Sequence, residues 1–157
     1  MCYVTRSPEE TRHLGARLAE LLRENDVLVL QGDMGAGKSE LTRGIARGLG
    51  IGGYITSPTF TILQVHEGGR LPLYHFDWYR LGDPEELYEL SMDEYLHMEG
   101  VAVIEWAERA PEVLPESYLE ITLTPLGEEE RSITLNPVGN FREISLPKEN
   151  EHESALD

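Results

Sequence analysis

Apolar residues near the N-terminus recur at the spacing of a helix, directly after a sequence that caps one. Ser7 can accept a hydrogen bond as the capping residue, Pro8 suits the first helical position, and Glu10 can reach back toward the cap. The apolar positions that follow are Leu14, Leu18, Leu21 and Leu22. Because residues three or four apart share one helix face, the pattern predicts a helix from Ser7 to about Arg23.

The next apolar stretch, residues 26–31, is continuous rather than periodic. Its sequence "DVLVLQ" is typical of a short strand buried in a parallel sheet. A glycine-containing loop follows, and "KSELTRGIARGLG" then has a helical pattern that should end at Gly48 or Gly50. The order is therefore strand, glycine loop, helix.

The rest of the chain alternates extended runs with turn signals. "TFTILQVHE" and "LPLYHFDWYRL" flank a Gly-Gly pair and predict a hairpin, and "DPEELYELSMDEYLH" predicts a helix capped by Asp83. "VAVIEW", residues 101–106, predicts another buried strand. "YLEITLTPLGEEERSITLNP" predicts a second hairpin that turns at Gly127, and "FREISLP" predicts a last short strand. These elements predict one α/β domain with a mixed sheet.

The charge balance narrows the classes of partner. The 157 residues include 13 Lys and Arg against 29 Asp and Glu, a net charge of −16. Such a surface repels polyanions, so we expect no direct binding of tRNA or DNA. The acidity serves either solubility or the docking of a basic protein. Residues 147–157 are polar and acidic, and we expect a disordered tail there.

Three features bear on the compartment. The chain has no apolar run long enough to cross a membrane, and its N-terminal sequence lacks the apolar core of a secretory signal. The single cysteine, Cys2, fits a reducing environment. We therefore expect a cytoplasmic protein without membrane association. Separately, we expect the free chain to be a monomer.

The glycine loop matches the phosphate-binding pattern G-x-x-x-x-G-K-[ST], with Gly32, Gly37, Lys38 and Ser39 at the defined positions. Glycines let backbone N–H groups approach phosphate oxygens, and the following helix adds positive potential at its N-terminus. Lys38 should contact the β- and γ-phosphates, and the Ser39 hydroxyl should bind Mg²⁺. The pattern predicts a single P-loop NTPase domain over residues 1–146, with a mixed β-sheet flanked by helices and a C-terminal β-hairpin.

Hydrolysis also needs an acid near Mg²⁺, and two predicted strand ends offer one. "VAVIE" ends in Glu105 and "LYHFD" ends in Asp77. Side chains at the carboxyl ends of parallel strands face the ligand crevice. We assign Glu105 to Mg²⁺, directly or through water. Asp77 is a second Mg²⁺ ligand, a residue that positions the attacking water, or a structural residue that caps a helix or pairs with Arg80.

Two further residues, Thr59 and Trp106, have both a structural and a functional interpretation. The loop "TSPTFT", which contains Thr59, is either a turn or a switch segment that folds over the γ-phosphate. Trp106 either packs in the core or contacts the nucleotide. Arg131, in the second hairpin, is a candidate nucleotide contact, and we interpret His75 as a sheet residue.

Several of these stretches together resemble one family. "GDMGAGKSELTRGIARGLG", "SPTFTI", "LYHFDWYRL", "DPEEL" and "VIEWAER" are similar in order and spacing to the TsaE family, formerly YjeE. The resemblance covers roughly Ser7 to Leu135. It implies a small bacterial ATPase, with ATP and Mg²⁺ as cofactors, that is needed to make the threonylcarbamoyl modification on the tRNA adenosine beside the anticodon. It also implies that the protein works with a TsaB–TsaD pair, in which TsaD performs the transfer. ATP hydrolysis would reset this complex, and the protein would contact tRNA only through it.

The resemblance also implies a set of site residues. Lys38, Asp77 and Glu105 would be catalytic, and Ser39 and Glu105 would bind the metal. The residues expected to bind the nucleotide are Asp33, Met34, Gly35, Ala36, Gly37, Lys38, Ser39, Glu40, Thr59 and Trp106.

Three positions depart from the family pattern. Ser39 stands where the family commonly has Thr, and Met34 replaces a usual Leu. Glu40 is less expected, because a carboxylate near a triphosphate weakens binding unless it points away, so we expect its side chain to face solvent or Arg43.

Two other functions stay open. One is a small-molecule kinase, although the chain lacks the arginine-rich segment that such enzymes use as a lid. The other is a nucleotide-gated binding module with negligible hydrolysis. No arginine finger is evident in the predicted loops, so an ATPase of this kind should turn over slowly without a partner.

Overall fold

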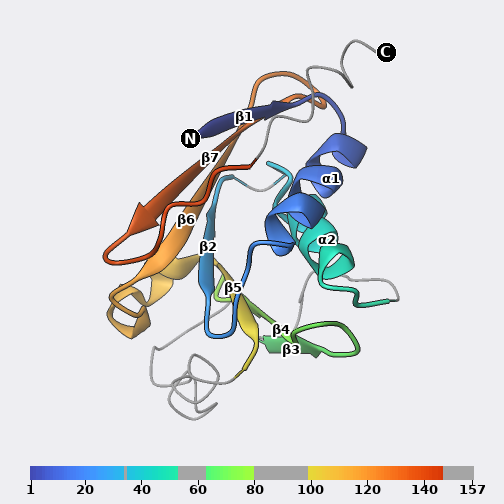
Figure 1. The fold of residues 1–157 in the computed structure, drawn as a ribbon. Helices are drawn as coiled ribbons and strands as arrows, with labels where there is room; N and C mark the ends of the chain where they lie inside the picture. Colours follow the sequence, from blue (N-terminus) through green and yellow to red (C-terminus); the bar gives the residue numbers. More distant parts are fainter. Residues whose placement is uncertain (34, 53–62, 80–98, 147–157) are drawn as a thin grey trace.

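The computed structural model describes residues 1–33, 35–52, 63–79 and 99–146, and these residues form a seven-stranded mixed sheet with helices packed on it (Figure 1). The strands are β1 Cys2–Thr5, β2 Val27–Gln31, β3 Leu63–His66, β4 Leu73–Asp77, β5 Val101–Glu105, β6 Tyr118–Pro125 and β7 Arg131–Val138. Their order across the sheet is β1-β7-β6-β2-β5-β4-β3. β2 runs parallel to β5 and β6, and β4 runs parallel to β5, whereas the remaining pairs are antiparallel. The predicted α/β class and mixed sheet are confirmed.

The central strand β2 is buried on both faces, as its continuous apolar sequence predicts. Leu28 and Leu30 point into the larger apolar cluster, on the face that the helices cover. Val27 and Val29 point into a second cluster on the opposite face. This alternation follows from the two-residue period of a strand.

The helices α1, Pro8–Ala19, and α2, Lys38–Gly48, lie side by side on one face of the sheet (Figure 1). Glycines bring them close together. A Cβ atom added to Gly44 would lie 2.0 Å from the carbonyl oxygen of Arg12, and one added to Gly15 would lie 2.5 Å from that of Leu41. Any side chain at these two positions would push the helices apart. The opposite face carries two short 3₁₀ segments, η1 Ala107–Arg109 and η2 Pro111–Val113.

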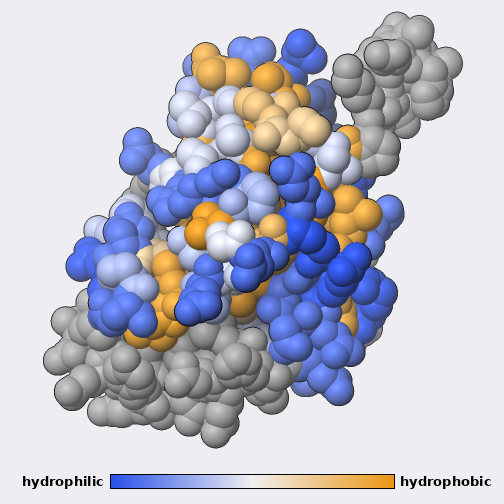
Figure 2. All heavy atoms as spheres, turned by 60° about the vertical axis from the view of Figure 1, so that its left-hand side comes forward, coloured by the Kyte–Doolittle hydropathy of each residue, from blue (hydrophilic) through white to orange (hydrophobic). Residues whose placement is uncertain are grey.

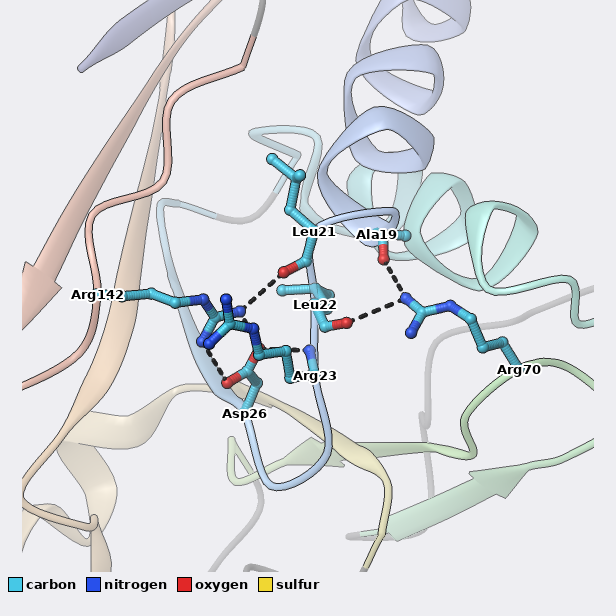
Figure 3. Close-up of polar contacts among 7 residues, drawn as sticks. All are labelled: Ala19, Leu21, Leu22, Arg23, Asp26, Arg70 and Arg142. Carbon is cyan, nitrogen blue, oxygen red and sulfur yellow. Dashed lines mark hydrogen bonds and ion pairs between the residues drawn. The ribbon is translucent and has the colours of Figure 1, made fainter.

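Helix α1 begins as predicted but ends at Ala19 rather than near Arg23. The Ser7 hydroxyl accepts a hydrogen bond from the N–H of Glu10, as expected of the cap. After Ala19 the chain turns, and the carbonyls of Ala19, Leu21 and Leu22 accept hydrogen bonds from two distant arginines (Figure 3). Arg70 donates to Ala19 and Leu22. Those long-range contacts are the reason that local periodicity overestimates the helix.

The predicted hairpins are confirmed, as antiparallel β3–β4 and β6–β7 pairs, and α2 ends at Gly48 as expected. The first strand, β1, was not predicted. It pairs with β7 at one sheet edge, with Cys2 opposite Thr134. The predicted strand "FREISLP" is wrong, because β1 already occupies that edge. Residues 141–146 instead run without strand structure, and the Leu146 N–H donates to the Tyr3 hydroxyl.

Several predictions fall outside the described residues: the helix that begins at Asp83, the loop around Thr59, and the tail 147–157. Within the described part of the chain, no helix is long and apolar enough to traverse a bilayer. The face shown in Figure 2 is largely hydrophilic and is interrupted by small groups of apolar residues.

Candidate nucleotide-binding site

The phosphate loop, residues 32–37, joins the carboxyl end of β2 to the start of α2. Gly35 and Gly37 have φ angles of 83° and 104°, a left-handed conformation that favours glycine. The Ala36 N–H donates to the Asp33 carbonyl over 3.0 Å, which closes a tight turn within the loop. The loop therefore has the glycine-dependent backbone that the pattern predicts.

The first turn of α2 presents backbone donors. Gly37 is the capping residue and provides no side-chain cap. The first intrahelical bond runs from the Leu41 N–H to the Gly37 carbonyl, at 3.0 Å. The preceding N–H groups, of Lys38, Ser39 and Glu40, have no intrahelical acceptor by the geometry of a helix. Together with the helix dipole they suit an anion.

Lys38 lies against the carboxyl end of β5. Its side chain is 7% exposed, and its Nζ lies 3.8 Å from Oε1 of Glu105, which is equally buried. The same Nζ lies 4.5 Å from the centre of the Trp106 ring. The carboxylate and the ring face offset part of the cost of burying the ammonium. The structure thus brings together the P-loop lysine and the acid assigned to the metal.

Glu105 has a second partner that sequence reasoning missed. Its Oε2 lies 2.6 Å from Nε2 of His75, in β4, and both side chains are buried. An imidazole with a hydrogen on Nε2 donates to the carboxylate and holds it in place. The signal was available in "HFD", because His75 and Asp77 are two residues apart and so share one face of their strand. His75 is a strand residue, as predicted, but it also orients Glu105.

Asp77 lies beside Glu105 at the end of the neighbouring strand. The two residues are register partners in the parallel β4–β5 pair. Burial raises the pKa of Asp77, the nearby Glu105 carboxylate raises it further, and a hydrogen bond from the Tyr79 N–H opposes both. That N–H donates to Oδ1 over 2.9 Å. The alternative partner, Arg80, lies outside the described residues.

The structure shows the packing predicted for Trp106, and its contact with the nucleotide stays a prediction. Trp106 packs against the apolar cluster on the side of the sheet away from the helices, and its ring also contacts Lys38. The ring centre of Tyr79 lies 4.8 Å from that of Trp106. Trp106 has φ 60° and ψ 40°, a left-handed conformation that is costly for a bulky residue. The surrounding contacts must stabilise it.

Glu40 points away from the loop. Its Oε1 accepts hydrogen bonds of 3.0 Å from Arg43 and from Arg12 of α1. Burial raises the pKa of Glu40, but the two guanidinium groups outweigh that effect and leave the pKa below its ordinary value. The expected contact with Arg43 is present, and the Arg12 contact was not foreseen.

The structure describes some of the remaining predicted site residues and not others. Asp33 is exposed and contributes its carbonyl to the loop turn, and Ser39 is half-buried as the second residue of α2. Met34 and Thr59 lie outside the described residues. Arg131 contacts the loop backbone, through Ala36 and Gly35.

The donor set fits a triphosphate with its metal. Ser39 and Glu105 supply hydroxyl and carboxylate oxygens, the hard ligands that Mg²⁺ prefers. Lys38 and the backbone donors of the loop complement phosphate oxygens. The glycine positions keep Cβ atoms out of the loop where a ligand would approach.

Comparison with known proteins gives a consistent result. A family model described as "Threonylcarbamoyl adenosine biosynthesis protein TsaE" matches residues 5–133. The tRNA threonylcarbamoyladenosine biosynthesis protein TsaE of Bacillus subtilis is 43% identical over 150 residues, which cover 96% of this chain and 94% of the relative. The protein of the same name from Treponema pallidum is 46% identical, over 84% of this chain and 97% of the relative. The crystal structure of Bacillus subtilis YdiB matches with a TM-score of 0.75 and 42% identity, over 89% of this chain and 86% of that one.

Proposed function

Since the chain belongs to the TsaE family, we propose that it is a Mg²⁺-dependent ATPase that supports threonylcarbamoyladenosine modification of tRNA together with a TsaB–TsaD-like complex. The pathway is the one that the relatives' names print. The observation that carries the ATPase proposal is the buried contact between Lys38 of the phosphate loop and Glu105 at the end of β5. This pair sets a phosphate-binding cation beside a metal-binding carboxylate.

The loop residues have defined roles in this proposal. Backbone N–H groups of Gly35, Gly37, Lys38 and Ser39 and the Lys38 ammonium bind the ATP phosphates, whereas the Ala36 N–H closes the loop turn. Lys38 exchanges its contact with Glu105 for a phosphate oxygen. Ser39 and Glu105 would hold Mg²⁺, which when bound neutralises charge on the phosphates. His75 keeps the Glu105 carboxylate oriented.

Asp77 is proposed to act on the attacking water. Its carboxylate orients the water for in-line attack on the γ-phosphorus and accepts a proton from it. Its raised pKa, caused first by burial, makes it a stronger base than an exposed aspartate. Trp106 and Thr59 are proposed as nucleotide contacts, with Trp106 near Lys38 as the supporting observation.

The partner is proposed to be a protein, with tRNA reached only through it. The net charge of −16 opposes direct contact with a polyanion. A cytoplasmic location belongs to the same proposal. If the isolated chain bound tRNA tightly at physiological salt, this part would be wrong.

Reconstitution tests the whole proposal. Modified tRNA is measured over several turnovers with TsaB, TsaD, tRNA, ATP and Mg²⁺, with and without the chain. We expect more product per TsaD with the wild type, and no gain with Lys38→Ala or after chelation of Mg²⁺. An absence of gain with the wild type would overturn the role in the pathway.

A second measurement separates hydrolysis from its rivals. We expect phosphate release from ATP without any added acceptor, and its loss in Glu105→Gln. Phosphate transfer to a metabolite would favour a kinase. Full support of tRNA modification by a variant that binds ATP but does not hydrolyse it would favour a nucleotide-gated module.

A further inference from the structure

Arg131 joins the C-terminal hairpin to the phosphate loop. It is the first residue of β7, and its Nε donates to the Ala36 carbonyl over 2.9 Å, a contact between residues 95 positions apart. Its Nη2 donates to the Gly35 carbonyl over 3.2 Å. The carbonyls of two successive peptide groups of the loop therefore accept hydrogen bonds from one guanidinium.

The sheet topology brings the arginine there. β6 runs parallel to β2, with Gln31 opposite Thr122, so the β6–β7 turn lies at the same edge as the phosphate loop. Gly32 passes close to β6, because an added Cβ would lie 2.8 Å from the Leu123 carbonyl oxygen. A Cβ on Gly37 would lie 3.6 Å from Nε of Arg131. The loop is thus packed against the hairpin.

The guanidinium is also held from the other side. Nη1 donates to the carbonyls of Gly127, Glu128 and Glu130, at 3.1, 3.2 and 2.8 Å. The planar fork of an arginine loses little freedom per hydrogen bond when it is fixed in this way. Arg131 therefore presents a rigid surface to the loop.

The contact of Arg131 with the loop carbonyls also determines where the loop N–H groups point. In a trans peptide the C=O and the N–H point in opposite directions. The Ala36 carbonyl shares its peptide with the Gly37 N–H, so a donor on the carbonyl directs this N–H away from Arg131. The Gly35 carbonyl shares its peptide with the Ala36 N–H, which closes the turn onto Asp33. A cation on a carbonyl also polarises the peptide and makes its N–H a better donor.

We infer that Arg131 is a positioning residue for phosphate binding: it fixes and polarises the peptide groups of residues 35–37 without touching the nucleotide. The inference rests on the proposed binding of ATP. It differs from a purely structural role, in which Arg131 would only brace the β6–β7 turn.

Isothermal titration calorimetry of the full chain with Mg²⁺-ADP and Mg²⁺-ATP tests the inference. We expect Arg131→Gln to weaken both affinities about tenfold, the effect of losing charged hydrogen bonds. Arg131→Lys, which keeps the charge but not the fork, should recover part of the loss. The control is Arg142→Gln, which removes an arginine that donates to the Leu21 carbonyl and to the Asp26 carboxylate, away from the phosphate loop. It should leave both affinities within about twofold.

The steady-state rates give a second readout that a bracing role would not move. At a temperature where every variant is folded, Arg131→Gln should raise KM for ATP about tenfold and change kcat less than about threefold. Equal affinities for the wild type and folded Arg131→Gln would overturn the inference alone, and if that variant did not fold, Arg131→Lys would decide by the same criterion. Failure of the wild type to bind either nucleotide would overturn the proposed function, and this inference with it.

Discussion

Two loops of this molecule are held by arginines from distant parts of the chain, one at the end of α1 and the other at the start of α2. At the first, the α1–β2 turn of residues 20–26, Arg142 donates to the Leu21 carbonyl and to both oxygens of the Asp26 carboxylate (Figure 3). Arg70 donates to the carbonyl of Ala19, the last residue of α1, and to that of Leu22 in the same turn. At the second, Arg131 donates to the phosphate loop and to its own turn, and all five of these described bonds end on backbone carbonyls.

The two ends of a helix differ in electrostatic sign. A cation at the C-terminal end of α1 is favourable, because the helix dipole is negative there. A cation near the N-terminal end of α2 meets the positive end of the dipole, and Lys38 adds another positive charge. The first arrangement stabilises the protein by itself, whereas the second becomes favourable when an anion is present. The arginines at the α1–β2 turn therefore contribute mainly to stability, whereas the arginine at the phosphate loop contributes mainly to ligand binding.

The largest effect is expected at Asp77, the carboxylate at the end of β4 that is proposed to act on water. It tests the assignment of ligand chemistry to the phosphate-loop side of the molecule. Asp77→Asn should lower ATP hydrolysis by at least about 100-fold, because the base that acts on water is lost. The same change should raise the melting temperature by about 1–2 °C at pH 7, since it removes a carboxylate that burial disfavours. Phosphate release and thermal unfolding measure the two effects.

The pH dependence follows from the sign of the shift. Because the pKa of Asp77 is raised in the folded state, its contribution to stability is fully present below the unfolded pKa of about 3.9 and declines as the pH rises through the folded pKa. The stability gain of Asp77→Asn should therefore grow between pH 4 and pH 7. Asp26→Asn, in the α1–β2 turn, is the control and should lose stability while keeping its activity. A destabilised Asp77→Asn with normal hydrolysis would contradict both assignments.

The second prediction concerns the α1–β2 turn. Arg142→Gln should lower the free energy of unfolding by about 2 kcal/mol, because it leaves the buried Asp26 carboxylate and the Leu21 carbonyl without their charged donor. The affinity for Mg²⁺-ADP should change less than about twofold.

Urea unfolding of the two single variants and the double variant with Asp26→Asn gives the coupling between the residues. We expect a coupling energy of about 1 kcal/mol or more. A loss of nucleotide affinity as large as that of Arg131→Gln would remove the distinction between the two loops.

Local sequence signals predicted the parts of the molecule that are built from neighbouring residues. The cap at Ser7, the glycine loop and the start of α2 each depend on residues within a few positions of one another. The placement of Glu105 beside Lys38 followed from a rule about parallel strands, and the contact is present. These predictions succeeded because the required geometry is set locally or by the fold class.

The parts that sequence missed depend on long-range register. The strand β1 has four residues, and its partner β7 lies about 130 positions away, so its own pattern is too short to identify it. The error at "FREISLP" has the same cause, because no local signal says which segment takes the edge beside β7. The His75–Glu105 and Arg131–Ala36 contacts likewise require knowledge of which strands are neighbours.

The smallest expected effect is at Glu40. This residue lies beside the phosphate loop, but its carboxylate is paired with arginine, as the Asp26 carboxylate is in the α1–β2 turn. Its carboxylate joins Arg12 of α1 to Arg43 of α2. Glu40→Gln should therefore cost about 0.5 kcal/mol of stability, the size expected for a partly exposed ion pair. It should leave the affinity for Mg²⁺-ADP within about twofold, because the carboxylate is already engaged away from the loop.

The pH dependence at Glu40 has the opposite sign to that at Asp77. Because the pKa of Glu40 is lowered in the folded state, its stabilisation is fully present above the unfolded pKa of about 4.3 and is lost as the pH falls through the lower folded value. Urea unfolding at pH 7 and pH 4 should show the difference between the wild type and Glu40→Gln shrinking in acid. A marked gain in nucleotide affinity in Glu40→Gln would mean that this carboxylate repels the phosphates. Position 40 would then belong to the binding loop rather than to the contact between the helices.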